Sequence, residues 1–156
     1  ANANAAANQM DARVRFVQGD ALDPPKRDFD HVFTNPPFHE GERSPDEARA
    51  LALQDEGRLA DWLQAGLKRP KSNGTFTVIL STGRLGWALN AVPHRGAVVI
   101  PLWPKQGVEA KRVILRVRKA SRAPLSFAHG ILLHEEDGRY TADADAILRG
   151  LKGIGS

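Results

Sequence analysis

Residues 29–38 read Phe-Asp-His-Val-Phe-Thr-Asn-Pro-Pro-Phe, and this stretch decides the fold. Its first six residues, from Phe29 to Thr34, form a short apolar run with strand-forming residue types. Asn35-Pro36-Pro37 follows at once, and the strand must end there because prolines cannot donate a hydrogen bond to a sheet ladder. We therefore predict a parallel strand in the centre of the sheet that leads directly into a proline-fixed loop at its carboxyl end.

The segments on both sides of this stretch alternate between strand and helix patterns. Upstream, Val14-Arg15-Phe16-Val17 alternates in polarity and predicts a strand that stops at Gly19-Asp20. Downstream we predict a helix that begins at Ser44, a helix over Leu59–Leu67, a turn at Asn73-Gly74, a strand over Thr75–Leu80, a helix over Leu85–Ala91, strands over Ala97–Leu102 and Arg112–Val117, a strand pair about Asp137-Gly138 and a last short helix. Such alternation predicts an α/β fold with a mostly parallel sheet. The strands ending at 102 and starting at 112 should pair antiparallel, because their connection is too short for a parallel crossover.

The composition is that of a single globular domain, with 156 residues, 42% hydrophobic and 26% charged. The sequence shows no apolar run of membrane-helix length, so we expect no membrane partner. The absence of cysteine excludes disulfides and thiolate metal sites, and it fits a cytoplasmic location. The five histidines form no ligand motif, so we expect no metal site. The net charge of +4 favours a polyanionic partner such as nucleic acid.

The Asn-Pro-Pro-Phe block at residues 35–38 resembles the catalytic loop of amino methyltransferases, which carries Asp, Asn or Ser before two prolines and an aromatic residue. The chemistry explains these residue types. The Asn35 carboxamide oxygen and the Pro36 carbonyl can each accept one N–H of a conjugated amine, and so hold its nitrogen toward tetrahedral geometry and stabilise the charge that develops on it. Pro37 helps to fix the direction of the carbonyl in advance, and Phe38 offers a face on which a base can stack.

Two further landmarks extend this resemblance along the chain. Asp20 and Ala21 end the predicted upstream strand, where proteins of this kind receive the adenine of S-adenosyl-L-methionine (SAM), and residues 67–74 resemble the turn that precedes the next strand. From about Val14 to Arg118 the sequence is most similar to the tRNA (adenine-N6) methyltransferase family. The resemblance implies a Rossmann-like class I methyltransferase fold, SAM as cofactor and tRNA as partner. It also places Asn35 beside the cofactor and implies RNA contacts at Lys105, Lys111 and Arg112.

The sequence departs from the family pattern at its beginning. The glycine-rich loop that cradles the methionine part of SAM is absent, and so is the acidic residue that binds the ribose hydroxyls. We therefore expect residues 1–156 to form one partial catalytic domain that lacks the first strands of its sheet and is inactive by itself. Three alternatives stay open: a protein glutamine methyltransferase with a similar loop, a small-molecule O-methyltransferase, and a catalytically inert fragment or binding module.

Overall fold

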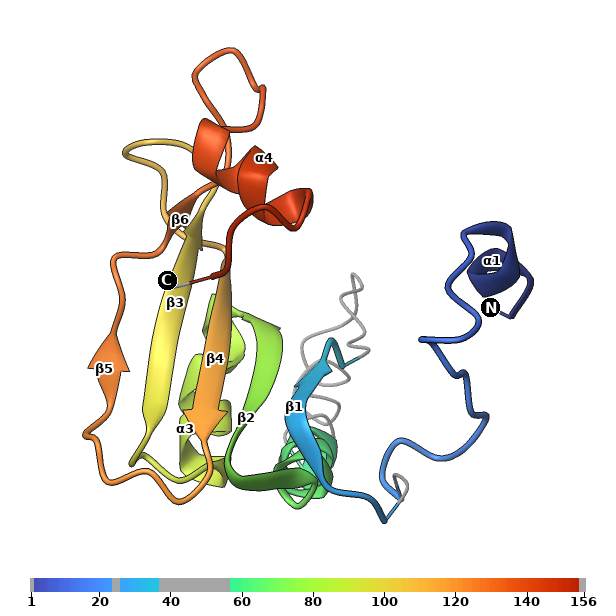
Figure 1. Cartoon of the computed structure of the whole chain (residues 1–156). Helices are drawn as coiled ribbons and strands as arrows, with labels where there is room; N and C mark the ends of the chain where they lie inside the picture. The colour runs from blue at the N-terminus through green and yellow to red at the C-terminus, as the bar shows by residue number, and fades with distance from the viewer. Residues whose placement is uncertain (1, 24–25, 37–56, 155–156) are drawn as a thin grey trace, which may run out of the picture.

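The computed structural model describes residues 2–23, 26–36 and 57–154 (Figure 1). The helix predicted from Ser44 lies outside these residues. In chain order the elements are α1 (Asn2–Ala7), β1 (Phe29–Thr34), a helix over residues 57–67, β2 (Pro70–Ser81), a 3-10 turn η1 (Thr82–Arg84), α3 (Leu85–Ala91), β3 (Ala97–Trp103), β4 (Arg112–Arg118), β5 (Ser126–Phe127), β6 (Ile131–Leu132) and α4 (Ala142–Leu148).

The strands form one open sheet in the order β1-β2-β4-β3-β5, with β6 also paired to β3. Strand β4 is antiparallel to both of its neighbours, β2 and β3, whereas β1 with β2, β3 with β5 and β3 with β6 pair in parallel. All strands except β4 therefore run in one direction. The predicted α/β class, with a mostly parallel sheet and an antiparallel late strand, is confirmed.

The main hydrophobic core lies between the sheet and a layer formed by the 57–67 helix and α3. Leu63 and Phe76 are completely buried in it, and Leu59 is nearly so. A Cβ atom built on Gly66 would lie 2.3 Å from Cε2 of Phe76, so only glycine lets the helix approach this ring. The opposite face of the sheet carries a second cluster around Ile100, Leu102 and Ile114, against which side chains of the C-terminal segment pack. Because apolar side chains of the strands point to both faces, each face of the sheet carries its own hydrophobic cluster.

Strand β2 contains a bulge where the sequence predicted a turn. Phe29 pairs with Pro70, whereas His31 pairs with Thr75, so β2 has extra residues between these two pairs. Asn73 adopts a φ of 65°, which asparagine tolerates better than most residues. A Cβ atom on Gly74 would lie 2.8 Å from the Asp30 carbonyl oxygen. The Asn-Gly pair therefore lets the strand kink and continue, and the prediction that the strand starts after it was wrong.

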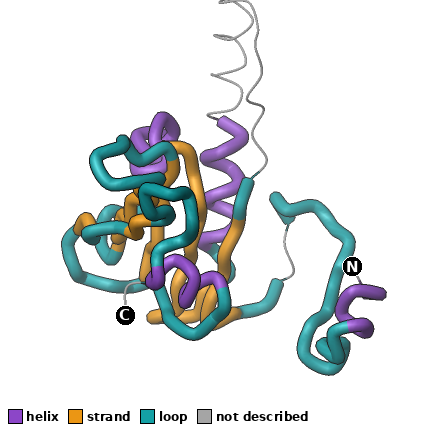
Figure 2. Tube along the Cα trace, turned by 90° about the horizontal axis from the view of Figure 1, so that it is seen from above, coloured by secondary structure: helices purple, strands orange, loops and turns teal. Residues whose placement is uncertain are grey.

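The N-terminal segment differs from its prediction. Residues 14–17 form no strand, and Val14, Phe16 and Val17 are exposed. Both views of the chain show residues 2–23 standing apart from the sheet (Figures 1 and 2). A polarity alternation forms a strand only when another strand supplies hydrogen-bond partners, and no described segment does so for residues 14–17. For the same reason β1 pairs on one side only among the described residues, and it is an edge strand rather than the predicted central one.

The C-terminal tail follows its prediction in part. The expected strand pair about Asp137-Gly138 is reduced to one antiparallel bridge between His134 and Tyr140, whose rings stack at 4.8 Å. The last helix, α4, begins after Thr141, whose hydroxyl accepts a hydrogen bond from the Ala144 amide at 3.1 Å as an N-cap. Among the described helices, none has the length and apolar character to cross a membrane.

Candidate active site

The candidate site lies at the carboxyl ends of β1 and β2. Asn35 is the first residue after β1, and Thr34 pairs with Val78, so β2 continues past the end of β1 to Ser81. Asn35 is exposed whereas Pro36 is buried. Ligands bind at this edge in open α/β sheets. The chain therefore anchors the loop through the proline ring while it presents the asparagine carboxamide outward.

Two side-chain hydrogen bonds hold β1 in place, one to the 57–67 helix and one to β2. The Trp62 indole N–H donates to Oγ1 of Thr34 at 2.7 Å, and Nδ1 of His31 lies 2.8 Å from Oγ1 of Thr75. Trp62 has the helical spacing of a core residue within the predicted helix over Leu59–Leu67. The polar end of an indole usually finds a partner when the ring is covered, but the sequence does not tell which partner it is.

Replacing Trp62 with Phe should destabilise the fold through this contact. The hydrogen bond contributes about 0.5–1.5 kcal/mol, and the smaller ring also loses some packing. Urea unfolding of Trp62→Phe, Thr34→Val and the double variant would isolate the bond, because the hydrogen bond can be lost only once. We expect the double variant to be more stable than the sum of the two single losses predicts. Strict additivity would show that the contact contributes nothing to stability.

The two proposed acceptors, the Asn35 carboxamide and the Pro36 carbonyl, have no hydrogen-bond partner among the described residues. Both acceptors thus remain available to a ligand as far as the described chain is concerned. Pro37 and Phe38, the other two residues predicted to be catalytic, lie outside the described residues. Their roles stay predictions.

Asp20 and Ala21 form a tight turn whose polar groups suit the adenine half of SAM, the expected cofactor. Oδ1 of Asp20 accepts the Leu22 amide at 2.9 Å, and the Asp20 carbonyl accepts the Asp23 amide at 3.1 Å. The exposed carboxylate keeps its second oxygen, and the Ala21 amide has no partner among the described residues. An acceptor beside a free N–H suits the exocyclic amine and a ring nitrogen of adenine. No residue of the sequence is matched to the methionine half.

The structure does not bring this turn into contact with Asn35. All hydrogen bonds of residues 2–23 to described residues stay within that segment. The assignment of Asp20 and Ala21 to cofactor binding therefore rests on the sequence pattern and on the geometry of the turn itself.

The predicted RNA contacts lie at the same edge of the sheet as Asn35. Arg112 pairs with Ser81 of β2 and with Leu102 of β3, and the Lys111 carbonyl accepts the Thr82 amide at 3.1 Å. Because β2 is the only strand between β1 and β4, these cations lie two strand spacings, roughly 10 Å, across the sheet from β1. The side chains of Lys111 and Arg112 are both exposed.

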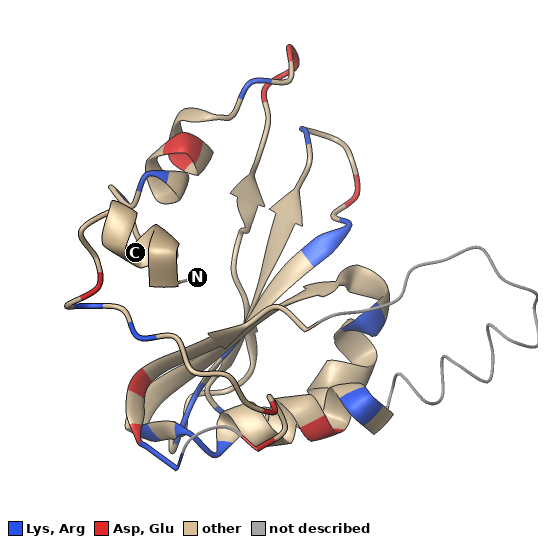
Figure 3. Ribbon diagram, turned by 90° about the vertical axis from the view of Figure 1, so that its right-hand side faces the viewer, with Lys and Arg blue, Asp and Glu red and all other residues tan. Residues whose placement is uncertain are grey.

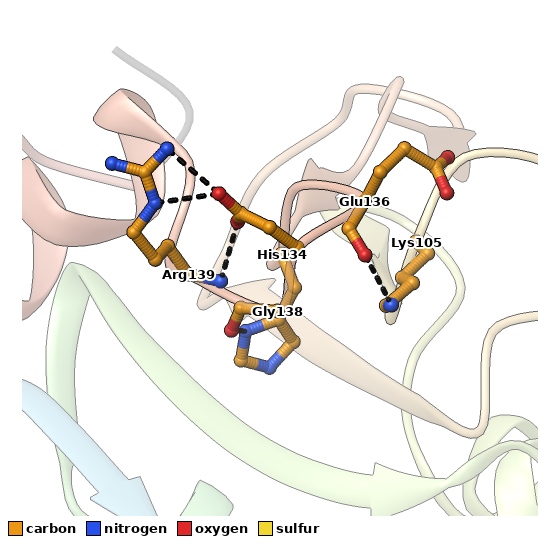
Figure 4. A network of polar contacts seen from close by, with 6 residues as sticks. Lys105, His134, Glu136, Gly138 and Arg139 are labelled. Atoms are coloured by element: carbon orange, nitrogen blue, oxygen red, sulfur yellow. Dashed lines mark hydrogen bonds and ion pairs between the residues drawn. The ribbon is translucent and has the colours of Figure 1, made fainter.

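Lys105 is more constrained than the other two cations. Its ammonium group donates to the Glu136 carbonyl at 2.8 Å and so ties the loop after β3 to the hairpin at residues 134–140 (Figure 4). In that hairpin the Arg139 amide and guanidinium donate to Asp137 and lower the pKa of its carboxyl group. Two of the three ammonium hydrogens of Lys105 remain for other acceptors.

Charge is not concentrated at this edge alone. Blue and red segments occur at both ends of the sheet in Figure 3, so basic residues are not confined to this edge. Within the ranges that the structure describes, no three His, Cys, Asp or Glu side chains gather in a way that could hold a metal ion.

Comparisons with known proteins agree with this architecture. The family model of the methyltransferase small domain matches residues 1–61. The crystal structure of a predicted O-methyltransferase, protein Atu636 from Agrobacterium tumefaciens, superposes with a TM-score of 0.74 and 22% identity, over 94% of this chain and 68% of that one. Among curated proteins, none matches the chain. At 22% identity this likeness shows the fold alone, and the family match over residues 1–61 is what supports SAM-dependent methylation.

Proposed function

We propose that the chain carries the catalytic loop of a SAM-dependent N-methyltransferase that acts on the N6 amine of an adenine in tRNA. The observation that carries the proposal is the position of Asn35 and Pro36. They follow β1 directly, with an exposed carboxamide beside a buried proline, at the sheet edge where this fold binds ligands.

The chemistry follows from what these two groups can do. The exocyclic nitrogen of adenine has two hydrogens, and its lone pair is delocalised into the ring. If the Asn35 carboxamide oxygen accepts one N–H and the Pro36 carbonyl the other, the lone pair is freed and directed toward the methyl group. When bound, SAM would supply that methyl group on a sulfonium centre: a C–N bond forms as the C–S bond breaks with its electron pair going to sulfur, and the nitrogen then releases one N–H proton to water. The two acceptors stabilise the positive charge that grows on nitrogen.

The alternatives differ in the substrate atom that receives the methyl group. A hydroxyl group has a single hydrogen, so two pre-placed acceptors have no use in O-methylation. The O-methyltransferase name of the similar structure belongs to that protein, and at 22% identity the likeness concerns the fold. A glutamine side-chain amide also has two N–H hydrogens, but the net charge of +4 and the cations at the same edge favour a polyanionic substrate.

The test is transfer of labelled methyl groups from SAM by the intact protein. Unmodified tRNA, a glutamine-containing peptide and a catechol would be offered in parallel, and the tRNA digested to nucleosides. We expect label in N6-methyladenosine and none in the peptide or the catechol. Label in the peptide or the catechol alone would overturn the proposed substrate. Calorimetric titration with SAM tests the remaining alternative, because an inert binding module would release no heat of cofactor binding.

A further inference from the structure

A pocket lies at the opposite edge of the sheet from Asn35. It has a volume of about 640 Å³ and is enclosed by the end of the 57–67 helix, the end of α3 and the end of β4. Arg118, the last residue of β4, pairs with Thr75 near the bulge of β2, so the hollow lies at the amino ends of the parallel strands. We call it the amino-edge pocket. Its lining includes Leu67, Lys68, Arg95, Val117, Arg118 and Lys119.

Four cationic side chains line the amino-edge pocket, and none of its lining residues, all of which the structure describes, is Asp or Glu. Lys68 and Arg95 are exposed, and their side chains make no hydrogen bond or ion pair with the described residues. Arg118 donates a single hydrogen bond, to the Asn73 carbonyl at 3.2 Å. The pocket therefore concentrates positive charge that the described fold does not neutralise.

Two helices end at this pocket, and the negative ends of their dipoles would repel a bound anion. Each helix terminus corresponds to about half a negative charge, so the two together offset about one of the four cations. Two carbonyls just after the 57–67 helix and the last carbonyl of α3 also accept hydrogen bonds. Lys119 donates to the Lys68 and Pro70 carbonyls at 3.4 and 2.8 Å, and Gln64 donates to the Ala91 carbonyl. Positive charge remains in excess after these contacts.

The pocket also has an apolar wall. Leu67, Ala91, Val92, Pro93 and Val117 all contribute to its lining, and Val92 and Val117 are nearly completely buried. A ligand that fits such a pocket combines a flat apolar body with negative charge. We propose that the amino-edge pocket binds a nucleotide, with its base on the apolar wall and its phosphate among Lys68, Arg95 and Arg118. The source is either a free nucleotide or one unit of an RNA chain.

This site is independent of methyl transfer, so its test uses binding without SAM. Equilibrium titrations of the full chain with 5′-AMP, adenosine and single-stranded hexa-adenylate would be compared. We expect 5′-AMP or hexa-adenylate to bind at least tenfold more tightly than adenosine, with an affinity that falls as salt rises. The variant Lys68→Glu/Arg95→Glu should lose at least tenfold in that affinity. Both side chains are exposed and make no described contact, so the thermal midpoint should stay unchanged.

Matched variants separate the site from general charge. Lys68→Gln/Arg95→Gln should fall between the wild type and the reversed pair. Arg58→Glu gives the same charge change per residue in the first described turn of the same helix, away from the pocket, and it should leave 5′-AMP binding intact. If Lys68→Glu/Arg95→Glu loses affinity for hexa-adenylate alone, the ligand of the pocket is one unit of an RNA chain. If it loses affinity for 5′-AMP as well, the ligand is a free nucleotide. Equal affinities for 5′-AMP, hexa-adenylate and adenosine, or no change in the reversed variant, would overturn the proposal.

Discussion

Replacement of Asn35 by Ala in the intact protein is expected to lower methyl-transfer turnover about a hundred- to a thousandfold, or roughly 2.7–4 kcal/mol of transition-state stabilisation. The carboxamide is exposed at the end of β1, and the substitution removes one pre-placed acceptor where positive charge develops. SAM affinity should stay close to that of the wild type, because the adenine turn at Asp20 makes no described contact with Asn35. Single-turnover transfer of label to tRNA, beside equilibrium SAM binding, measures both quantities.

Asn35→Asp is the matched control for this prediction. It keeps an oxygen acceptor at the same place and adds a charge, so part of the activity should survive. If Asn35→Ala retains near wild-type turnover, the loop is only the end of a strand, and the proposed mechanism is wrong. A parallel loss of SAM binding and turnover would assign Asn35 to the cofactor instead of the target nitrogen.

The substitution Phe76→Ala is expected to give the largest loss of stability, about 3–5 kcal/mol. The ring is completely buried between β2 and the 57–67 helix, and a Cβ atom built on Gly66 would lie 2.3 Å from it. Glycine has no side chain that could move into the cavity, so the void stays and its full cost remains. Chemical unfolding followed by circular dichroism measures the change in the free energy of unfolding.

Phe33→Ala is the control for that experiment. Phe33 belongs to the neighbouring strand β1 but is 85% exposed, so its removal should change stability by less than about 0.5 kcal/mol. Equal losses from both variants would contradict the burial seen in the structure. A small loss from Phe76→Ala would show that the helix closes over the cavity in spite of Gly66.

The sequence was sufficient for features that local patterns control. Two prolines placed the end of β1 correctly, because a missing N–H ends a ladder wherever the strand lies. The short connection at residues 104–110 predicted the antiparallel pairing of β3 with β4, since chain length alone excludes a crossover. The 57–67 helix followed from the apolar periodicity over Leu59–Leu67, and α3 has the bounds predicted for it, Leu85–Ala91.

Features that depend on distant partners were not predictable in the same way. Residues 14–17 carry a strand pattern but have no described partner, and their side chains are exposed. Asn73-Gly74 has the composition of a turn, yet Pro70 before it and Thr75 after it both pair with β1, and Asn73 and Gly74 exchange backbone hydrogen bonds with Lys119, so β2 continues through it. The support of Thr34 by Trp62 joins residues that only the folded sheet brings together. The amino-edge pocket likewise collects its cations from three separate segments.

The pairing of β1 on one side has a kinetic consequence. Leu102 and Arg112 are close in sequence and pair across a short hairpin, whereas Val32 must find Phe76 across a much longer loop. Loop-closure entropy grows with that separation, so we expect the β3–β4 hairpin to form before β1 is added. A strand that joins last and has hydrogen bonds along one edge is also the first to open locally. Within the described part of the chain we therefore expect β1, the strand that ends at Asn35, to exchange its backbone amide hydrogens faster than the strands that pair on both sides.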